Sequence, residues 1–260
     1  MTPNQALQDM RSQVPLVHCI TNYVAMNVAA NVLLAAGASP AMMHATEEVA
    51  DFVPVTDAVT VNIGTLSPHW VDGMHKAIAT AQETGKPWVL DPVAHFATPY
   101  RSGVTRDLLA RKPTIIRGNA SEIMALAGVD SAGKGADSGD GVDDARDAAI
   151  MLAKAQSCIV AVTGVTDFVT QGARHANITG GSGVMPQVTA LGCSLTALIG
   201  AYAPVAAPLD ATIAALIHFA EAGARAAANC QGPGSFAAGF LDQLHILQPG
   251  DLDEGRVKWD

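Results

Sequence analysis

The chain has 260 residues, of which 49% are hydrophobic and 15% charged, as expected for a globular protein with a large core. Its formal net charge of −9 argues against a nucleic-acid or anionic-membrane surface. The first 13 residues have no apolar signal-peptide core, and the four cysteines are far apart with no C-x-x-C pair. These features predict a cytoplasmic protein with reduced thiols.

Short β-rich runs alternate with helical patterns, which predicts an α/β fold with a mainly parallel central sheet and helices on both faces. The predicted strands cover residues 15–20, 39–43, 58–64, 87–93, 113–119 and 158–164. The predicted helices cover residues 21–37, 68–85, 210–230 and 235–244. Residues 167–172 and 174–180 are typical of an antiparallel hairpin that turns at Gln171 and Gly172.

One uncharged segment, Ala176–Leu209, is long enough to suggest a membrane span. Glycines and prolines interrupt it, and its apolar part is short, so a buried helix at the centre of the domain is the better interpretation. No repeat or Pro-rich linker divides the chain, which predicts a single domain over residues 1–260 with a flexible tail from about 246.

Residues Gly128–Gly141 read as a surface loop. Within it, Gly128–Lys134 matches the start of a P-loop, G-x-x-x-x-G-K. The next residue is Gly135, where the motif needs Ser or Thr for Mg²⁺, and the segment follows a helical pattern instead of a strand. We therefore reject a phosphate site there.

Polar residues at strand ends are the stronger candidates, because ligands of open α/β sheets lie outside the carboxyl ends of the strands. Asp91 follows the apolar run WVL, and Glu122 follows the strand-like TIIRGN. Both could hold Mg²⁺, or Asp91 could start a turn and Glu122 could occupy the first turn of a helix. Arg117 could face a phosphate or pair with a carboxylate. The residues alone leave these alternatives open.

Gly192 and Cys193 stand at the start of a predicted helix, where backbone N–H groups can face an anion. A thiol of ordinary pKa is mostly protonated near neutral pH, although a helix N-terminus can lower that pKa. The pattern indicates an α/β enzyme with an anion site at Cys193, but it names no substrate.

Seven segments together resemble the hydroxyethylthiazole kinase family of the ribokinase-like superfamily, over about residues 13–243. They read PLVHCITN, LLAAGASPAMM, VNIGTL, PWVLDPVA, RGNASEIMALAG, VAVTG and QGPGSF. The resemblance implies ATP- and Mg²⁺-dependent phosphorylation of the hydroxyl of 4-methyl-5-(2-hydroxyethyl)thiazole in thiamine salvage. It also implies a homotrimer with its sites at subunit interfaces.

The resemblance further implies a role for each matching residue. Met42 and Asn22 would bind the thiazole, and Arg117 and Thr163 would bind ATP. Asp91 and Glu122 would organise the metal and its waters.

Cys193 stands where many relatives in the superfamily carry an Asp that faces the attacking hydroxyl. The resemblance therefore implies a catalytic Cys193 that orients the hydroxyl and takes its proton late. The family usually reads Gly-Thr-Gly-Cys in this turn, whereas this chain has Ala190 and Leu191 in place of the first two residues. Ala190 would add a methyl group beside the substrate, and Leu191 would remove a hydroxyl.

Two alternatives stay open. A kinase of the same fold could act on another small alcohol, such as hydroxymethylpyrimidine. A non-catalytic small-molecule binder could have kept the pocket and lost turnover, for which Ala190 and Leu191 are the only support.

Overall fold

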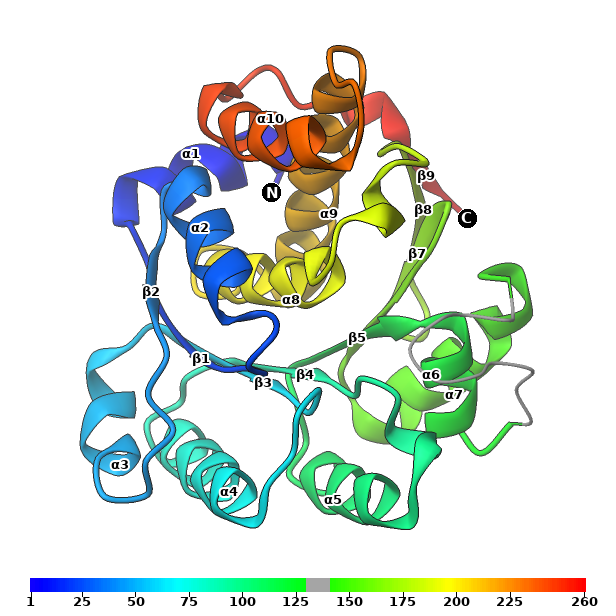
Figure 1. Ribbon diagram of the computed structural model, residues 1–260. Coiled ribbons are helices and arrows are strands. Elements are labelled where there is room, and N and C mark those ends of the chain that lie inside the picture. Colours follow the sequence, from blue (N-terminus) through cyan, green and yellow to red (C-terminus); the bar gives the residue numbers. More distant parts are fainter. Residues whose placement is uncertain (130–140) are drawn as a thin grey trace.

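The computed structural model describes residues 1–129 and 141–260, so most of the predicted loop Gly128–Gly141, including Lys134, lies outside the described residues. Within the described part, one mixed sheet has the strand order β2-β1-β3-β4-β5-β6-β7-β8-β9 (Figure 1). The strands from β2 to β6 are parallel, and β6 to β9 are antiparallel. Their bounds are β1 Leu16–Ile20, β2 Ser39–Ala41, β3 Ala58–Asn62, β4 Trp88–Asp91, β5 Ile115–Asn119, β6 Ile159–Thr163, β7 Thr166–Thr170, β8 His175–Thr179 and β9 Val257–Trp259.

Helices cover both faces of this sheet, as the sequence predicts (Figure 1). One layer contains α1 Pro3–Gln13, α2 Met26–Ala36, α8 Leu191–Tyr202, α9 Pro208–Ala227 and α10 Pro233–Ile246. The opposite layer contains α3 Val49–Phe52, α4 Pro68–Glu83, α5 Pro99–Leu109, α6 Ala120–Leu126 and α7 Arg146–Gln156. The two layers bury two separate apolar clusters against the sheet. The mainly parallel α/β architecture is thus confirmed, with an antiparallel end.

The uncharged segment forms the buried helix α8, as expected. At Gly200 an added Cβ would lie 2.5 Å from Cγ2 of Thr60 and 3.0 Å from Cγ1 of Val17. Only a glycine therefore lets α8 approach β1 and β3 this closely. In the described part of the chain, no helix has the length and apolar character needed to cross a membrane.

The predicted hairpin is confirmed as β7 and β8, which pair from Thr166 with Thr179 to Thr170 with His175. The helix predicted from residue 21 begins only at Met26. Asn22 is the reason, because its side-chain Oδ1 accepts hydrogen bonds from the backbone N–H groups of Val24 and Ala25 and holds a turn there instead.

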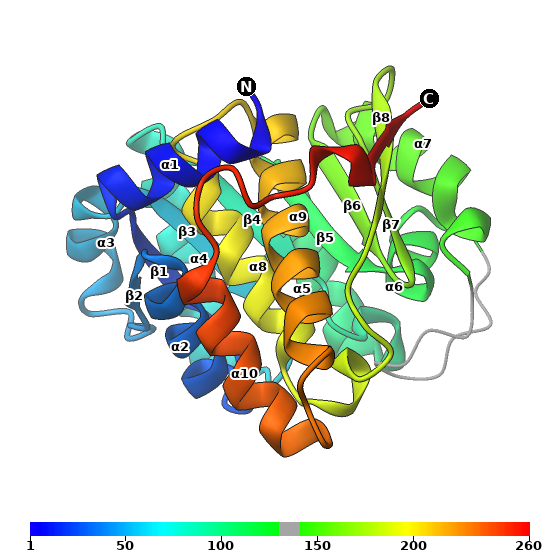
Figure 2. The same ribbon diagram turned by 90° about the horizontal axis from the view of Figure 1, so that it is seen from above.

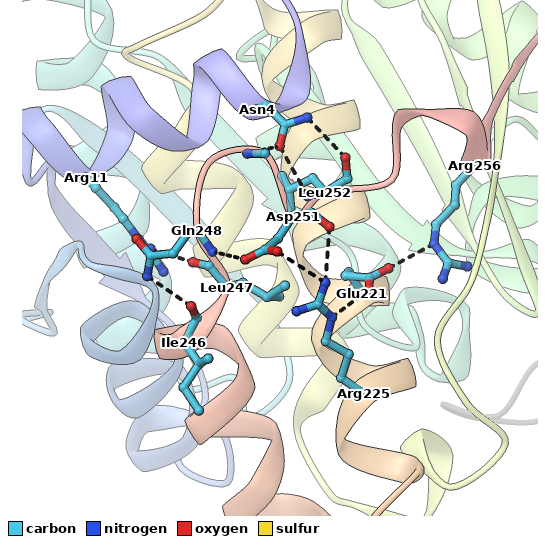
Figure 3. A network of polar contacts seen from close by, with 11 residues as sticks. Asn4, Arg11, Glu221, Arg225, Ile246, Leu247, Gln248, Asp251, Leu252 and Arg256 are labelled. Carbon is cyan, nitrogen blue, oxygen red and sulfur yellow. Dashed lines mark hydrogen bonds and ion pairs between the residues drawn. The ribbon is translucent and has the colours of Figure 1, made fainter.

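The C-terminal segment differs from the frayed tail that the sequence predicts. Val257–Trp259 forms the edge strand β9 and pairs with β8. Figure 2 shows the chain after α10 running across α9 to reach β8. Contacts far along the sequence hold it, because Asn4 Nδ2 donates to the Leu252 carbonyl at 3.1 Å and Arg256 Nε pairs with Glu221 Oε2 at 3.0 Å (Figure 3). The amino-acid sequence of the C-terminal segment gives no indication of these distant contacts.

A buried histidine joins three helices of the α8 layer. His218 of α9 accepts a hydrogen bond at Nδ1 from the Tyr202 hydroxyl at 2.9 Å, and its Nε2 lies 3.2 Å from the Leu244 carbonyl. Burial, together with the charge of Arg11, lowers the pKa of His218 to about 3. The imidazole is therefore neutral in the folded state across the physiological range.

We expect His218 to make the protein acid-sensitive. Because its folded pKa lies below the unfolded value of about 6.5, its contribution to stability is present above pH 6.5 and is lost as the pH falls toward 3. Between pH 6.5 and 5 the loss is about 2 kcal/mol, at 1.36 kcal/mol per pH unit. Urea unfolding of the parent and of His218→Gln at pH 7.5 and 5.0 measures it. Equal pH dependence in the two proteins would contradict the assignment.

Candidate active site

The carboxyl ends of five neighbouring parallel strands meet the first turn of α8, and six of the predicted site residues gather there. They are Asn22 after β1, Asp91 at the end of β4, Arg117 in β5, Glu122 in the first turn of α6, Thr163 at the end of β6, and Cys193 in α8. Met42 follows β2 and is partly buried against the α8 layer, and Ala190 is the N-cap of α8.

Asp91 is the most buried acid of the cluster, with a side chain that is 0% exposed. Its Oδ2 accepts hydrogen bonds from Asn62 Nδ2 at 2.8 Å and from Thr196 Oγ1 at 2.7 Å. Its Oδ1 has no hydrogen-bond partner among the described residues. Burial raises the pKa of Asp91, which the Arg117 guanidinium opposes from 3.7 Å away. The site therefore presents one free carboxylate oxygen in a desolvated position.

Two asparagines connect Asp91 to Cys193. Asn22 Nδ2 donates to Asn62 Oδ1 at 2.8 Å and lies 3.5 Å from Cys193 Sγ. The Gly64 backbone N–H also donates to Asn62 Oδ1, at 2.9 Å. Buried amides with all of these partners hold one orientation. The thiol and the carboxylate thus occupy set positions relative to each other.

Burial raises the pKa of Cys193 to about 11, and the charge of Asp91 adds to the shift. Hydrogen bonds from Asn62 and Asn22 and the charge of Arg117 oppose this only in part. The lowering that a helix start allows is therefore outweighed by desolvation. Because the group is a protonated thiol near neutral pH, it can orient a hydroxyl by hydrogen bonding, but it cannot receive a proton.

Glu122 serves as the capping residue that one interpretation of the sequence anticipates. Its Oε2 accepts from the Asn119 backbone N–H at 2.8 Å, and the Asn119 side chain accepts from the Glu122 N–H at 2.9 Å. Its Oε1 accepts from the Ala94 N–H at 2.9 Å, across the loop after β4. Burial and the charge of Asp91 raise the pKa of Glu122 to about 7. A metal role for Glu122 stays a prediction.

Arg117 lies beneath the first turn of α8. Its Nη2 donates to Thr163 Oγ1, and its Nε is buried with no hydrogen-bond partner among the described residues. An added Cβ at Gly192 would lie 2.9 Å from Arg117 Nη1, so the guanidinium packs directly against the helix backbone. The guanidinium and the free N–H groups of a helix start place positive charge at one point, which suits an anion.

Asn62 and Thr196 contact Asp91 but are absent from the predicted site. Each carried a signal in the sequence. Asn62 ends an apolar strand just as Asp91 does, so the strand-end argument applies to it equally. Thr196 follows Cys193 by three residues, which places both side chains on one face of α8.

Comparisons with known proteins show the family of this chain. Residues 7–249 match the model of the hydroxyethylthiazole kinase family. The chain belongs to this family. A hydroxyethylthiazole kinase from Gemmatimonas aurantiaca is 60% identical over 100% of this chain and 94% of that relative. One from Rhizobium leguminosarum bv. trifolii is 61% identical over 97% of this chain and 95% of that relative.

Solved structures show the same fold. Hydroxyethylthiazole kinase from Pyrococcus horikoshii has a TM-score of 0.91 and 39% identity, covering 99% of this chain and 98% of that one. An ADP complex of Bacillus subtilis pyridoxal kinase has a TM-score of 0.63 at 18% identity, over 80% of this chain and 90% of that one. A ribokinase-like superfamily protein from Enterococcus faecalis has a TM-score of 0.67 at 10% identity, over 93% of each chain. The fold is therefore ribokinase-like.

The turn before Cys193 departs from the family's usual residues in two different ways. Ala190 adopts a left-handed conformation with φ 63°, which favours glycine and costs an alanine about 1 kcal/mol. Leu191 is 6% exposed and belongs to the apolar core of the α8 layer. Leu191 therefore contributes packing, and its substitution for Thr does not simply delete a hydroxyl from the site.

We expect Gly192→Ala to weaken ATP use, because its Cβ would displace the Arg117 guanidinium. Losing one charge-assisted hydrogen bond costs about 1.5 kcal/mol, or roughly a tenfold increase in KM for ATP. Steady-state titration with ATP measures the change. Gly183→Ala is the matched control, since an added Cβ there meets nothing within 4 Å. Equal KM values for both variants would contradict the predicted role of Arg117 in binding ATP.

Proposed function

We propose that this chain transfers a phosphoryl group from ATP to the hydroxyl of 4-methyl-5-(2-hydroxyethyl)thiazole, in thiamine salvage. Family membership over nearly the whole chain supports the reaction. The observation that carries it is the convergence of Asp91, Arg117 and Cys193 at the first turn of α8. Phosphoryl transfer needs positioning and charge stabilisation at one point, and little else from the protein.

In this mechanism, Arg117, Thr163 and the N–H groups that begin α8 bind the ATP phosphates and stabilise the charge of the transferring group. Asn22 and the Cys193 thiol orient the attacking hydroxyl. Met42 and Ala190 contact the thiazole. The hydroxyl proton leaves late, once its oxygen has bonded to phosphorus and become acidic, and passes to an oxygen of the transferred phosphoryl group or to water, so a protonated Cys193 does not block the reaction.

The residues present suit Mg²⁺ as the metal. The unpartnered Oδ1 of Asp91 is a hard, anionic donor, and Glu122 lies close enough for the charge of Asp91 to raise its pKa. Mg²⁺ is usually held by one or two carboxylates with waters and phosphates completing its shell. We propose that Asp91 and Glu122 hold it, Glu122 through water. When bound, Mg²⁺ would neutralise charge on the ATP phosphates.

We also propose a cytoplasmic homotrimer with sites at subunit interfaces. Tyr23 and Val24 support this assembly, because they directly follow Asn22 and leave 68% and 57% of their surface exposed. Light scattering on a gel-filtration column measures the mass of the particle. A stable monomer would refute the assembly without touching the reaction.

The decisive experiment is ATP consumption by the purified protein with Mg²⁺ and either the thiazole alcohol or hydroxymethylpyrimidine. We expect turnover of the thiazole alcohol, with its phosphate identified by mass spectrometry. Preferential turnover of hydroxymethylpyrimidine would point to a kinase with a different substrate. Calorimetric binding of the thiazole alcohol without turnover of either compound would point to a non-catalytic binder.

A further inference from the structure

Arg101 connects the loops that follow β3 and β4, and neither the strand-end pattern nor the family motifs single it out. It stands in the first turn of α5, where its positive charge is unfavourable because it faces the positive end of the helix dipole. Its guanidinium donates to four backbone carbonyls. They are Ile63 at 2.8 Å, Gly64 at 3.2 Å, Val93 at 2.6 Å and Ala94 at 3.1 Å.

Two of the four residues whose carbonyls accept hydrogen bonds from Arg101 also donate their backbone N–H groups to side chains of the site. The Gly64 N–H donates to Asn62 Oδ1 at 2.9 Å, and Asn62 in turn donates to Asp91. The Ala94 N–H donates to Glu122 Oε1 at 2.9 Å. A single residue, Gly64 in one case and Ala94 in the other, thus connects Arg101 to each of these contacts.

The loop conformation needs such a restraint. Ala94 has φ 45°, in the left-handed region that an alanine adopts only when its surroundings impose it. Its peptide planes must turn its N–H toward Glu122 and its carbonyl toward Arg101 at the same time. A planar guanidinium with donors in a fixed fork suits several carbonyls at once, whereas the ammonium of lysine does not.

We propose that Arg101 is a positioning residue for phosphoryl transfer, which sets Asn62, Asp91 and Glu122 by clamping the loops after β3 and β4. This inference rests on the proposed kinase function. It assigns Arg101 no contact with substrate or metal, since all four of its partners are backbone carbonyls.

The test compares Arg101→Met, which keeps the aliphatic stem, and Arg101→Lys, which keeps the charge. Arg106→Met is the matched control, because Arg106 is an exposed arginine of the same helix. We expect Arg101→Met to lower kcat at least about tenfold, as removal of residues that orient a site does, while KM for both substrates changes less than about threefold. Arg101→Lys should be intermediate, and Arg106→Met should match the parent.

Amide hydrogen exchange of the protein without metal or ligands gives a readout that is independent of activity. We expect the Gly64 and Ala94 amides to exchange at least about tenfold faster in Arg101→Met, while β1 and β6 keep the parental rates. Exchange that rises equally throughout the sheet, or an unchanged kcat, would overturn the proposal. If the methionine variant does not fold, the lysine variant decides on the same two readouts. A parent without kinase activity would refute the proposed function, and the exchange arm would still report on the clamp.

Discussion

Asp91→Asn is expected to lower kcat about 10³-fold, the upper range for removal of one electrostatic group from a phosphoryl- or acyl-transfer site. An asparagine carbonyl can accept both the Asn62 and the Thr196 hydrogen bonds that now go to Oδ2. Its NH₂ group then takes the place of the unpartnered Oδ1. The change therefore keeps the local packing while removing the free acceptor and the negative charge.

The thermal stability of Asp91→Asn should not fall with its kcat. Because burial raises the pKa of Asp91, its ionised form is costly in the folded protein, and a neutral asparagine relieves that cost. We expect Tm in the absence of metal to be unchanged or higher, while kcat falls at every Mg²⁺ concentration. Thr196→Val, which removes one hydrogen bond and no charge, should lose much less activity. A kcat within threefold of the parent at limiting Mg²⁺ would refute the metal role of Asp91.

Cys193→Ala is expected to slow turnover about 10²-fold and to leave ATP binding nearly unchanged, because the role proposed for the thiol is to orient the acceptor hydroxyl. Cys193→Ser separates two roles. If the thiol only orients the hydroxyl, serine preserves a hydrogen-bonding group and kcat stays within about tenfold of the parent. If a thiolate acts as base, serine is as poor as alanine, since its hydroxyl does not ionise.

Cys193→Asp should remain active, because the Asn22 amide that contacts the sulfur can donate to a carboxylate. Alkylation of the parent supplies a second measurement. With a pKa of about 11, Cys193 should react slowly with iodoacetamide at pH 7.5 and faster with each unit of increasing pH. The thiazole alcohol should protect it. If Cys193→Ala keeps the full kcat of the parent, Cys193 contributes only packing.

Much of the fold follows from the sequence because its causes are local. Apolar runs such as AVTVN and WVLD are buried on both faces, and a parallel sheet covered by helices is the architecture that buries them. The carboxyl ends of parallel strands share one edge, so the order of residues along the chain is enough to group Asp91, Arg117 and Glu122. The predicted hairpin and the buried helix α8 are also confirmed, because the residues that predict each of them lie within one short stretch of the chain.

The remaining features depend on contacts between residues distant in the chain. Residues 251–260 are mostly charged and look like a polar tail, yet β8 supplies a pairing edge for residues 257–259 within it. The side chain of Leu191 turns into the core because of the way α8 docks on the sheet. Arg101 joins the loop after β4, seven and eight residues away in sequence, to the loop after β3, which is 37 and 38 residues away, because the docking of α5 brings its guanidinium to both.

The sequence by itself determined the apolar runs that become strands, the family and the identity of the reactive groups. Only the tertiary structure decided their protonation. The thiol of Cys193 has a pKa of about 11 and Glu122 one of about 7, because both are desolvated beside the buried Asp91. Desolvation is a property of everything that surrounds a group in space, and no local stretch of residues encodes it.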